Sequence, residues 1–193
     1  MGRPLRTQFD GAIYHVTARG NNARLIFIDD RDRELFLQVF ATTLGVLQWR
    51  CHAFCLMGNH YHLLLETPNG DLGIGMCRLN GQYARGFNRR HGRRGHLFEQ
   101  RYHAVLINRE AHLLEACRYI VLNPVRAALC EAADEWKWSS FRSTAGLVPP
   151  LPFLAVEALL QQFGPDLNSA RDRYTAFVAE GSEATSLQAL IAA

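Results

Sequence analysis

The chain has 193 residues, and 48% of them are hydrophobic, which is enough to bury a sizeable core in one domain with an appendage. No stretch approaches the roughly 18 apolar residues that a membrane-spanning helix needs, and the N-terminus lacks the apolar core of a signal peptide. These features argue against a membrane protein and predict a cytoplasmic one. The net charge is only +3, but 20 of the 21 basic residues are arginines. Arginine suits bidentate contact to phosphate, although a GC-rich genome would also raise its usage.

Four segments rich in β-branched, aromatic and apolar residues predict strands. They cover residues 13–17, 51–56, 61–67 and 102–107. Gly58 and Asn59 lie between the second and third segments, and this pair favours a tight turn. We therefore expect the second and third strands to form a hairpin.

Three segments with apolar residues at helical spacing predict helices. They cover about residues 30–46, 72–88 and 108–121, the last beginning at Asn108 or Arg109 and ending before Pro124. Asp29 or Asp30 can cap the first helix, and Asp71 the second. The alternation of strands and helices is that of a ferredoxin-like α+β fold, an antiparallel βαββαβ sheet with helices on one face. The other face is predicted to be free for a ligand.

The C-terminal part is predicted to be a helical extension. Proline-rich residues 149–152 are typical of a linker, so we divide the chain into a main domain, residues 1–148, and an extension, residues 149–193. Two short amphipathic helices are expected in the extension, at residues 154–163 and 170–178. Trp136, Trp138 and Phe141, before the linker, are predicted to pack on an edge of the core.

The segment from Arg78 to His103, here called the arginine segment, is strongly basic. Seven arginines against one acid, Glu99, give it a net charge of +6, while the rest of the chain carries −3. Arginines that follow phosphates, interleaved with aromatic residues that stack on bases, are typical of single-strand binding. The alternative is a solvated loop over core aromatics, and Tyr83 with Phe87 one turn later fits a core position. The residues expected to contact nucleic acid are Arg19, Arg78, Arg85, Arg89, Arg90, Arg93, Arg94, Arg101 and His103.

His60 and His62 are two residues apart in a predicted strand. Because side chains alternate between the faces of a strand, both imidazoles point to one face and Tyr61 to the other. Two such imidazoles can bind one metal ion without bending the backbone. Exposed or hydrogen-bonded histidines without a metal explain the same pattern.

Tyr119 and Asn123 are four residues apart at the end of the third predicted helix, so they share one face. Taken alone, Tyr119 fits a core tyrosine and Asn123 a helix cap. Taken with His60 and His62, they indicate a different site. A hard divalent ion held by two imidazoles and one amide oxygen keeps positions open for phosphate oxygens, and a nearby tyrosine can attack the phosphorus.

Several motifs occur in order along the chain. They are YHVTARGN at residues 14–21, MGNHYHLLL at 57–65, YARGFNRR at 83–90, RYIVLNPVRA at 118–127 and WSS at 138–140. This series resembles the single-tyrosine HUH transposases of the insertion-sequence type, and most closely the REP-associated tyrosine transposases. The resemblance covers roughly residues 11–141. Gly58 stands where that family commonly has proline, and the start of the first motif region differs from that of some members, so their target sequence is not carried over.

The resemblance implies that His60 and His62 are metal ligands, Asn123 the third ligand and Tyr119 the nucleophile. It implies a nickase and strand transferase, dependent on Mg²⁺ or Mn²⁺, that acts on single-stranded DNA at hairpins through a 5′-phosphotyrosine. Such a protein would be associated with the nucleoid, and the sequence leaves open whether it forms a homodimer.

Two other functions remain as alternatives. One is a catalytically inactive, RRM-like sheet that binds single-stranded nucleic acid, which metal-dependent covalent adduct formation would distinguish from the enzyme. The other is a zinc hydrolase, which is less well supported because no glutamate or aspartate base is placed beside His60 and His62.

Overall fold

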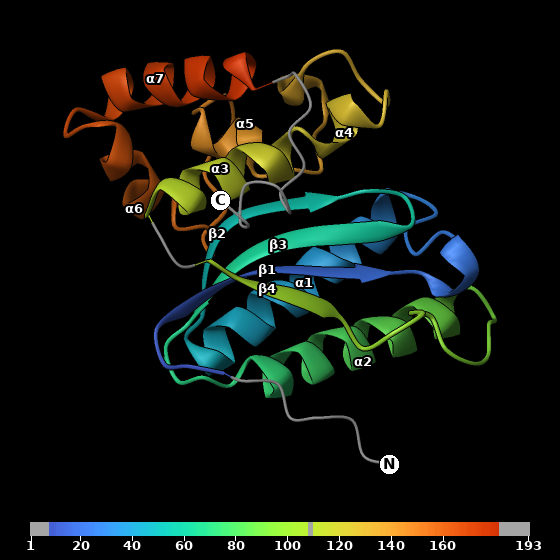
Figure 1. Cartoon of the computed structure of the whole chain (residues 1–193). Helices are drawn as coiled ribbons and strands as arrows, with labels where there is room; N and C mark the ends of the chain where they lie inside the picture. Colours follow the sequence, from blue (N-terminus) through green and yellow to red (C-terminus); the bar gives the residue numbers. More distant parts are fainter. Residues whose placement is uncertain (1–7, 108–109, 182–193) are drawn as a thin grey trace.

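The structure, a computed structural model, describes residues 8–107 and 110–181. Its four strands form one antiparallel sheet in the order β2-β3-β1-β4 (Figure 1). The strands are β1 Ala12–Arg19, β2 Arg50–Leu56, β3 His60–Thr67 and β4 His103–Ile107. Helix α1 follows β1, and helix α2 follows β3. This order confirms the predicted ferredoxin-like α+β fold.

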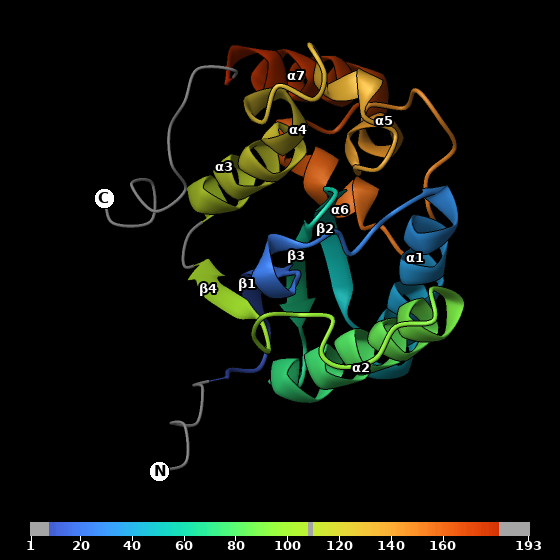
Figure 2. The same cartoon turned by 90° about the vertical axis from the view of Figure 1, so that its right-hand side faces the viewer.

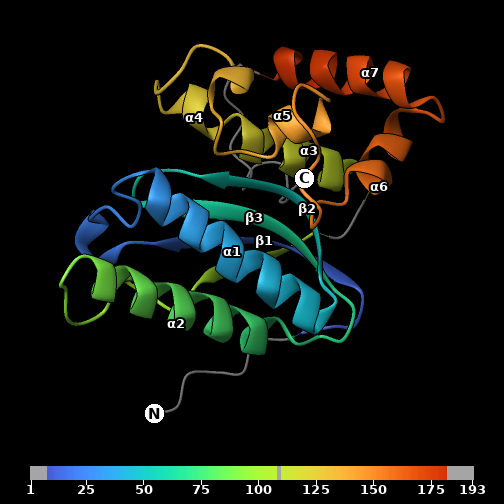
Figure 3. The same ribbon diagram turned by 180° about the vertical axis from the view of Figure 1, so that it is seen from behind.

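Helices α1 (Asp30–Leu47) and α2 (Leu72–Arg90) cover one face of the sheet (Figure 3). Phe36 of α1 packs against Tyr61 of β3 with ring centres 4.8 Å apart, and against Tyr83 of α2 at 5.1 Å. Tyr83 and Phe87 are fully buried, as their spacing predicts. The apolar stripes of both helices therefore form the core on this face.

The aspartates that precede the two helices behave differently. Asp29 caps α1, because its carboxylate accepts a hydrogen bond from the Asp32 backbone N–H at 3.1 Å. Asp71 stands at the start of α2, but its carboxylate accepts instead from the indole N–H of Trp49, at 2.6 Å. Asp71 is therefore the N-cap residue of α2, as predicted, but its carboxylate makes no capping hydrogen bond and binds Trp49 instead.

Helix α3 (Glu110–Val121) packs on the opposite face of the sheet, over β2 and β3 (Figure 2). The expected start of this helix, at Asn108 or Arg109, lies outside the described residues. The prediction that this face is free was wrong over β2 and β3. Leu63, Leu64 and Leu65 are all fully buried, and consecutive apolar residues of this kind indicate a strand that is covered on both faces.

Short helices continue the layer that α3 begins. They are α4 Asn123–Arg126, α5 Phe141–Thr144, α6 Val156–Leu160 and α7 Leu167–Glu180, with 3-10 helices at Ala133–Glu135 and Gln161–Phe163. A further 3-10 helix, Asn21–Ala23, follows β1. Trp136 and Trp138 lie at the edge of the core as predicted: the Trp136 indole N–H donates to the Leu56 carbonyl at 3.2 Å. Within the described residues, no helix combines the length and the apolar character that crossing a membrane requires.

The C-terminal helices pack on the rest of the chain. The Ala155 N–H donates to the Cys51 carbonyl of β2 at 2.8 Å, which fixes the chain just after the proline-rich residues. Tyr174 of α7 packs against Phe141 and Phe163, each with ring centres 5.7 Å apart. Residues 154–181 thus share the core of the main domain, and the boundary after residue 148 stays a proposal.

Candidate active site

The strand β3 places His60 and His62 on the sheet face that carries α3. Their ring centres are 5.0 Å apart. Tyr61, between them, points into the opposite layer, where its fully buried hydroxyl donates to the Asn80 side-chain oxygen at 2.6 Å. The strand period therefore brings the two histidines together as predicted.

Each of the two histidines makes a hydrogen bond through Nδ1. The Nδ1 atom of His60 lies 2.7 Å from the side-chain oxygen of Asn59, whose amide nitrogen donates to the Ala23 carbonyl at 3.1 Å. The Nδ1 atom of His62 lies 2.9 Å from Nε2 of His15. The Nε2 atom of His62 is buried and has no hydrogen-bond partner. A buried polar atom without a partner is uncommon and calls for an explanation such as a bound ion.

Burial keeps these imidazoles neutral. It lowers the pKa of His62 well below its usual value, with smaller contributions from the charges of His15 and His60. Burial, then the nearby charge of Arg19, lowers the pKa of His60. Burial, then the charge of His103, lowers the pKa of His15 to about 4. Neutral imidazoles carry the lone pair that a metal ion binds.

Tyr119 on α3 lies beside the histidines. Its ring centre is 5.9 Å from that of His62 and 5.9 Å from that of His15, in edge-on contacts. All six tyrosines fall within the described residues, and Tyr119 is the one that is partly exposed. The buried tyrosines are Tyr14, Tyr61, Tyr83, Tyr102 and Tyr174. Tyr119 is therefore the tyrosine whose position beside the histidines and whose solvent exposure suit a nucleophile.

Asn123 lies one turn beyond Tyr119 and is the first residue of α4, just after the end of α3 at Val121. Its side-chain nitrogen donates to the Tyr119 carbonyl at 2.8 Å and to the Ile120 carbonyl at 3.4 Å. The amide nitrogen thus caps the helix, which is the structural role that the sequence left open. The amide oxygen remains the atom suited to bind a cation.

The described residues fit a divalent metal ion only if a ligand other than histidine, cysteine, aspartate or glutamate contributes. Among the described residues, no group of three or more His, Cys, Asp or Glu side chains is placed to hold a metal. A metal at the histidine pair would therefore use Nε2 of His60 and His62, the amide oxygen of Asn123, and oxygens from water or substrate. The unpartnered Nε2 of His62 supports this set.

Sequence reasoning missed two residues beside Tyr119. One is His15. The other is Arg126, whose guanidinium lies over the Tyr119 ring at 4.8 Å and donates to the Tyr119 carbonyl at 3.4 Å. Both lie within motifs that the sequence displays, and Arg126 is seven residues, or two helical turns, after Tyr119. His15 has no comparable signal, because its contact depends on how β1 pairs with β3.

Two of the predicted nucleic-acid contacts share the sheet face of the histidines. Arg19 of β1 is paired with His60 of β3, and directly opposed residues of an antiparallel pair point to the same face. His103 of β4 is paired with Thr17, which is in turn paired with His62. These two cationic or polar side chains therefore border the candidate site.

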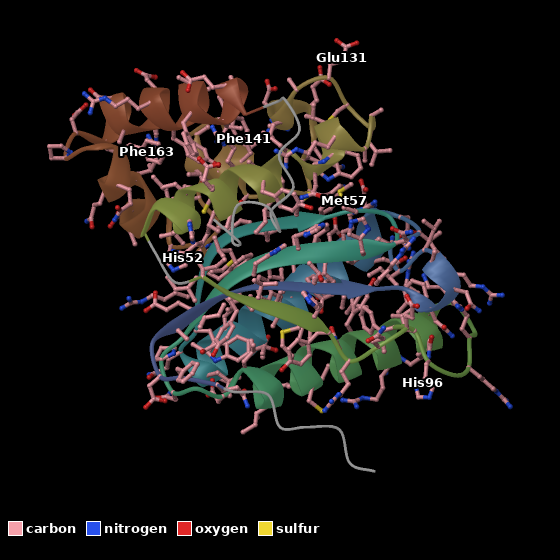
Figure 4. The ribbon with its side chains drawn as sticks, viewed as in Figure 1. His52, Met57, His96, Glu131, Phe141 and Phe163 are labelled. Carbon is pink, nitrogen blue, oxygen red and sulfur yellow. The ribbon has the colours of Figure 1, made fainter. Side chains whose placement is uncertain are left out.

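The other predicted contacts lie on or after α2, in the layer on the far side of the sheet. Arg85 and Arg101 line a groove of about 820 Å³ between α2 and residues 95–102. This region comes close to the turn before His60 at the end of β1. There the Gly20 N–H donates to the Asn59 carbonyl at 2.8 Å, and the Asn21 N–H donates to the Leu97 carbonyl at 2.9 Å. Met57, before the histidine pair, and His96, in the arginine segment, lie toward the same end of the molecule (Figure 4).

Arg90 differs from the other arginines because its charge is already paired. Its guanidinium contacts the Asp29 carboxylate at 2.5 Å and the buried Asp32 carboxylate at 2.5 Å. The hydrogen bond from Arg90 is the main reason why the pKa of Asp29 is lowered. Arg90 thus joins the end of α2 to the start of α1, and its contact with nucleic acid stays a prediction.

A larger hollow, of about 1060 Å³, lies between α1 and residues 150–158. Its lining is mostly apolar and includes none of the predicted site residues. The volume of a hollow alone therefore does not identify the candidate site in this protein. The contact of neutral imidazoles with a tyrosine identifies it.

Comparison with known proteins identifies the family of the chain. The model of a family described as "Transposase IS200 like" matches residues 8–123. A Haemophilus influenzae protein named as a REP-associated tyrosine transposase is 25% identical over 142 residues, which cover 68% of this chain and 80% of that protein. A solved structure of a REP-associated tyrosine transposase bound to a REP hairpin has a TM-score of 0.65 and 18% identity, and the match covers 77% of this chain and 89% of that one. The chain belongs to the IS200-like family of transposases, which are enzymes.

Proposed function

We propose that the protein is a metal-dependent nickase and strand transferase for single-stranded DNA, with Tyr119 as the nucleophile. The observation that carries this proposal is the contact between the Tyr119 ring and His62, whose Nε2 is buried without a partner. Membership of the transposase family supports strand transfer as the reaction. The similar solved structure holds a REP hairpin, which supports hairpin DNA as the substrate and the nucleoid as the place of action.

The roles of the side chains follow from their chemistry. His60, His62 and Asn123 would hold Mg²⁺ or Mn²⁺, and this ion when bound would polarise the scissile phosphate. The Tyr119 hydroxyl attacks the phosphorus, a bond forms between its oxygen and the phosphorus, and the bond from phosphorus to the 3′-oxygen breaks. The 3′-oxygen leaves as a hydroxyl, so the proton that tyrosine loses is balanced. The 5′-phosphotyrosine keeps the phosphodiester energy, and a 3′-hydroxyl can rejoin the strand without a nucleotide cofactor.

Single-stranded DNA would reach Tyr119 along the end of the sheet that carries Arg19 and His103. Arg19 and His103 border the histidines, while Arg85 and Arg101 line the groove beyond the end of β1. The backbone hydrogen bonds of Gly20 and Asn21 connect the end of β1 to Asn59 and to Leu97, which supports a continuous path for DNA around this end of the sheet. Arginine contacts of this kind bind phosphates without regard to sequence.

Covalent trapping tests the proposal. The full chain is incubated with manganese and a labelled hairpin oligonucleotide that has single-stranded flanks, and the products are separated on a denaturing gel. We expect a protein–DNA adduct from the wild type and none from Tyr119→Phe, although both bind the hairpin in a native gel. Tyr14→Phe, which removes a buried hydroxyl, is the matched control and keeps the adduct. Hairpin binding by the wild type without any adduct would instead support the inactive single-strand binding module.

A further inference from the structure

His15 is a buried residue of β1 that touches both His62 and Tyr119. Its Nε2 lies 2.9 Å from Nδ1 of His62, and the two ring planes are only 8° from parallel. Rings stacked face to face at van der Waals contact, about 3.5 Å, cannot bring two nitrogens that close. The ring centres are 5.2 Å apart, so the bonded nitrogens lie between them and the rings meet edge to edge. This is the geometry of a hydrogen bond in the plane of both imidazoles.

One nitrogen of this pair must donate, and the surroundings show which. A neutral imidazole has one N–H and one lone pair. If His15 donated, the proton of His62 would be on its Nε2, which is buried and has no acceptor. If His62 donates, Nε2 presents a lone pair toward the place where a cation would lie. Only the second arrangement permits His62 to bind a metal through Nε2.

His60 shows the same arrangement with a different acceptor. The amide nitrogen of Asn59 donates to the Ala23 carbonyl, so its oxygen faces Nδ1 of His60 and accepts from it. An amide oxygen cannot donate, and His60 is therefore held with its Nε2 lone pair free. Asn59 and His15 thus supply one acceptor to each of the two histidines.

We propose that His15 is a positioning residue, which fixes His62 as the Nδ1–H tautomer and so aims its Nε2 at the metal. This inference rests on the proposed function. Metal-binding histidines usually donate their second N–H to a carboxylate, a carbonyl or water. A neutral imidazole does so here without adding a negative charge, which suits a site that must admit a DNA phosphate.

Nitrogen NMR of the metal-free protein at pH 7.5 tests the tautomer directly. In ¹⁵N-labelled wild type, long-range ¹H–¹⁵N spectra are expected to show His62 protonated at Nδ1 and not at Nε2. In His15→Phe, which fills the space but offers no acceptor, His62 should shift toward the Nε2–H form. His60, whose acceptor is Asn59, should keep its tautomer in both proteins and is the internal control. A wild-type His62 protonated at Nε2 would overturn the proposal, whether or not any variant folds.

Calorimetric titration with manganese gives the second readout. The loss of such an acceptor lowers metal affinity by about 10- to 100-fold, and we expect this range for His15→Phe. His15→Gln, whose side-chain oxygen reaches a similar position and can accept, should recover most of the affinity. Unchanged affinity and tautomer in His15→Phe would refute the role. If the wild type binds no manganese, the proposed function fails, while the tautomer measurement still decides the role of His15 in orienting His62.

Discussion

The Nδ1 atoms of His60 and His62 are hydrogen-bonded without any metal present. This determines how much metal affinity should fall when either residue is replaced. Both are neutral, and each has its Nε2 left for a ligand. Asn123 contributes a neutral oxygen whose place water can take. The three residues should therefore differ in how much metal affinity depends on them.

We predict that His60→Ala or His62→Ala lowers manganese affinity by roughly 100-fold or more, and that Asn123→Ala lowers it by about tenfold. Isothermal titration calorimetry on the folded variants measures the effect. His96→Ala, which removes an exposed histidine of the arginine segment, is the matched control and should bind as the wild type does. Wild-type affinity in His60→Ala would show that the histidine pair does not bind the metal.

The sequence predicts some of these residues better than others. The period of a strand is enough to pair His60 with His62, and the period of a helix is enough to pair Tyr119 with Asn123. His15 lies 47 residues before His62, and its contact requires the register between β1 and β3. Register is a tertiary property, which a motif in one segment does not reveal.

At the scale of elements, the α1–α2 pair depends on a buried carboxylate. Asp32 of α1 is fully buried and accepts hydrogen bonds from the Ile28 N–H at 2.9 Å and from Arg90 of α2 at 2.5 Å. His91 also lies 2.9 Å from it. Removing the carboxylate takes the acceptor from the Ile28 N–H, while Arg90 keeps its contact with Asp29.

We predict that Asp32→Ala lowers the free energy of unfolding by about 2 kcal/mol, as expected when a buried hydrogen-bond acceptor is removed from its donors. Urea unfolding followed by circular dichroism gives the value. The control is Asp30→Ala, in the same helix turn: Asp30 pairs with Lys137 at an exposed position, and its loss should leave the curve nearly unchanged. Equal midpoints for the two variants would show that the Asp32 cluster does not hold α1 to α2.

The sequence predicts the elements but not all of their placement. The βαββαβ order follows from periodicity and turn residues, since these are local signals. The packing of α3 over β2 and β3 was not predicted, although the consecutive leucines of β3 indicate a strand that is covered on both faces. Likewise, the carboxylate of Asp71 is bound by Trp49, a residue 22 positions earlier, and no local rule for caps includes such a partner.

At the scale of the whole molecule, the sheet separates two chemical surfaces. The layer of α3 carries Tyr119 next to the histidines, and the layer of α2 leads into the basic loop of the arginine segment (Figure 1). Arg89, Arg93 and Arg94 lie at the end of α2 and in this loop. They lack the paired carboxylates that hold Arg90, so they are the better test of a DNA-binding surface.

We predict that changing Arg89, Arg93 and Arg94 together to glutamine weakens single-strand binding for all sequences. The log–log dependence on salt should flatten by roughly 0.7 for each phosphate that the variant no longer binds. Fluorescence anisotropy at several salt concentrations measures both quantities. The control changes the exposed Arg31, Arg50 and Arg173 to glutamine, which alters net charge equally. Identical slopes for the two triple variants would show that the loop arginines are merely solvated.

Mapping the covalent adduct shows directly whether Tyr119 is the nucleophile. Wild-type protein is allowed to react with manganese and hairpin DNA, treated with nuclease and trypsin, and analysed by mass spectrometry. Trypsin is expected to release residues 119–126 as one peptide, in which Tyr119 is the sole tyrosine. This peptide should carry a nucleotide through its 5′-phosphate. A nucleotide on the peptide of Tyr83 or Tyr102, or an intact adduct from Tyr119→Phe, would contradict the assignment.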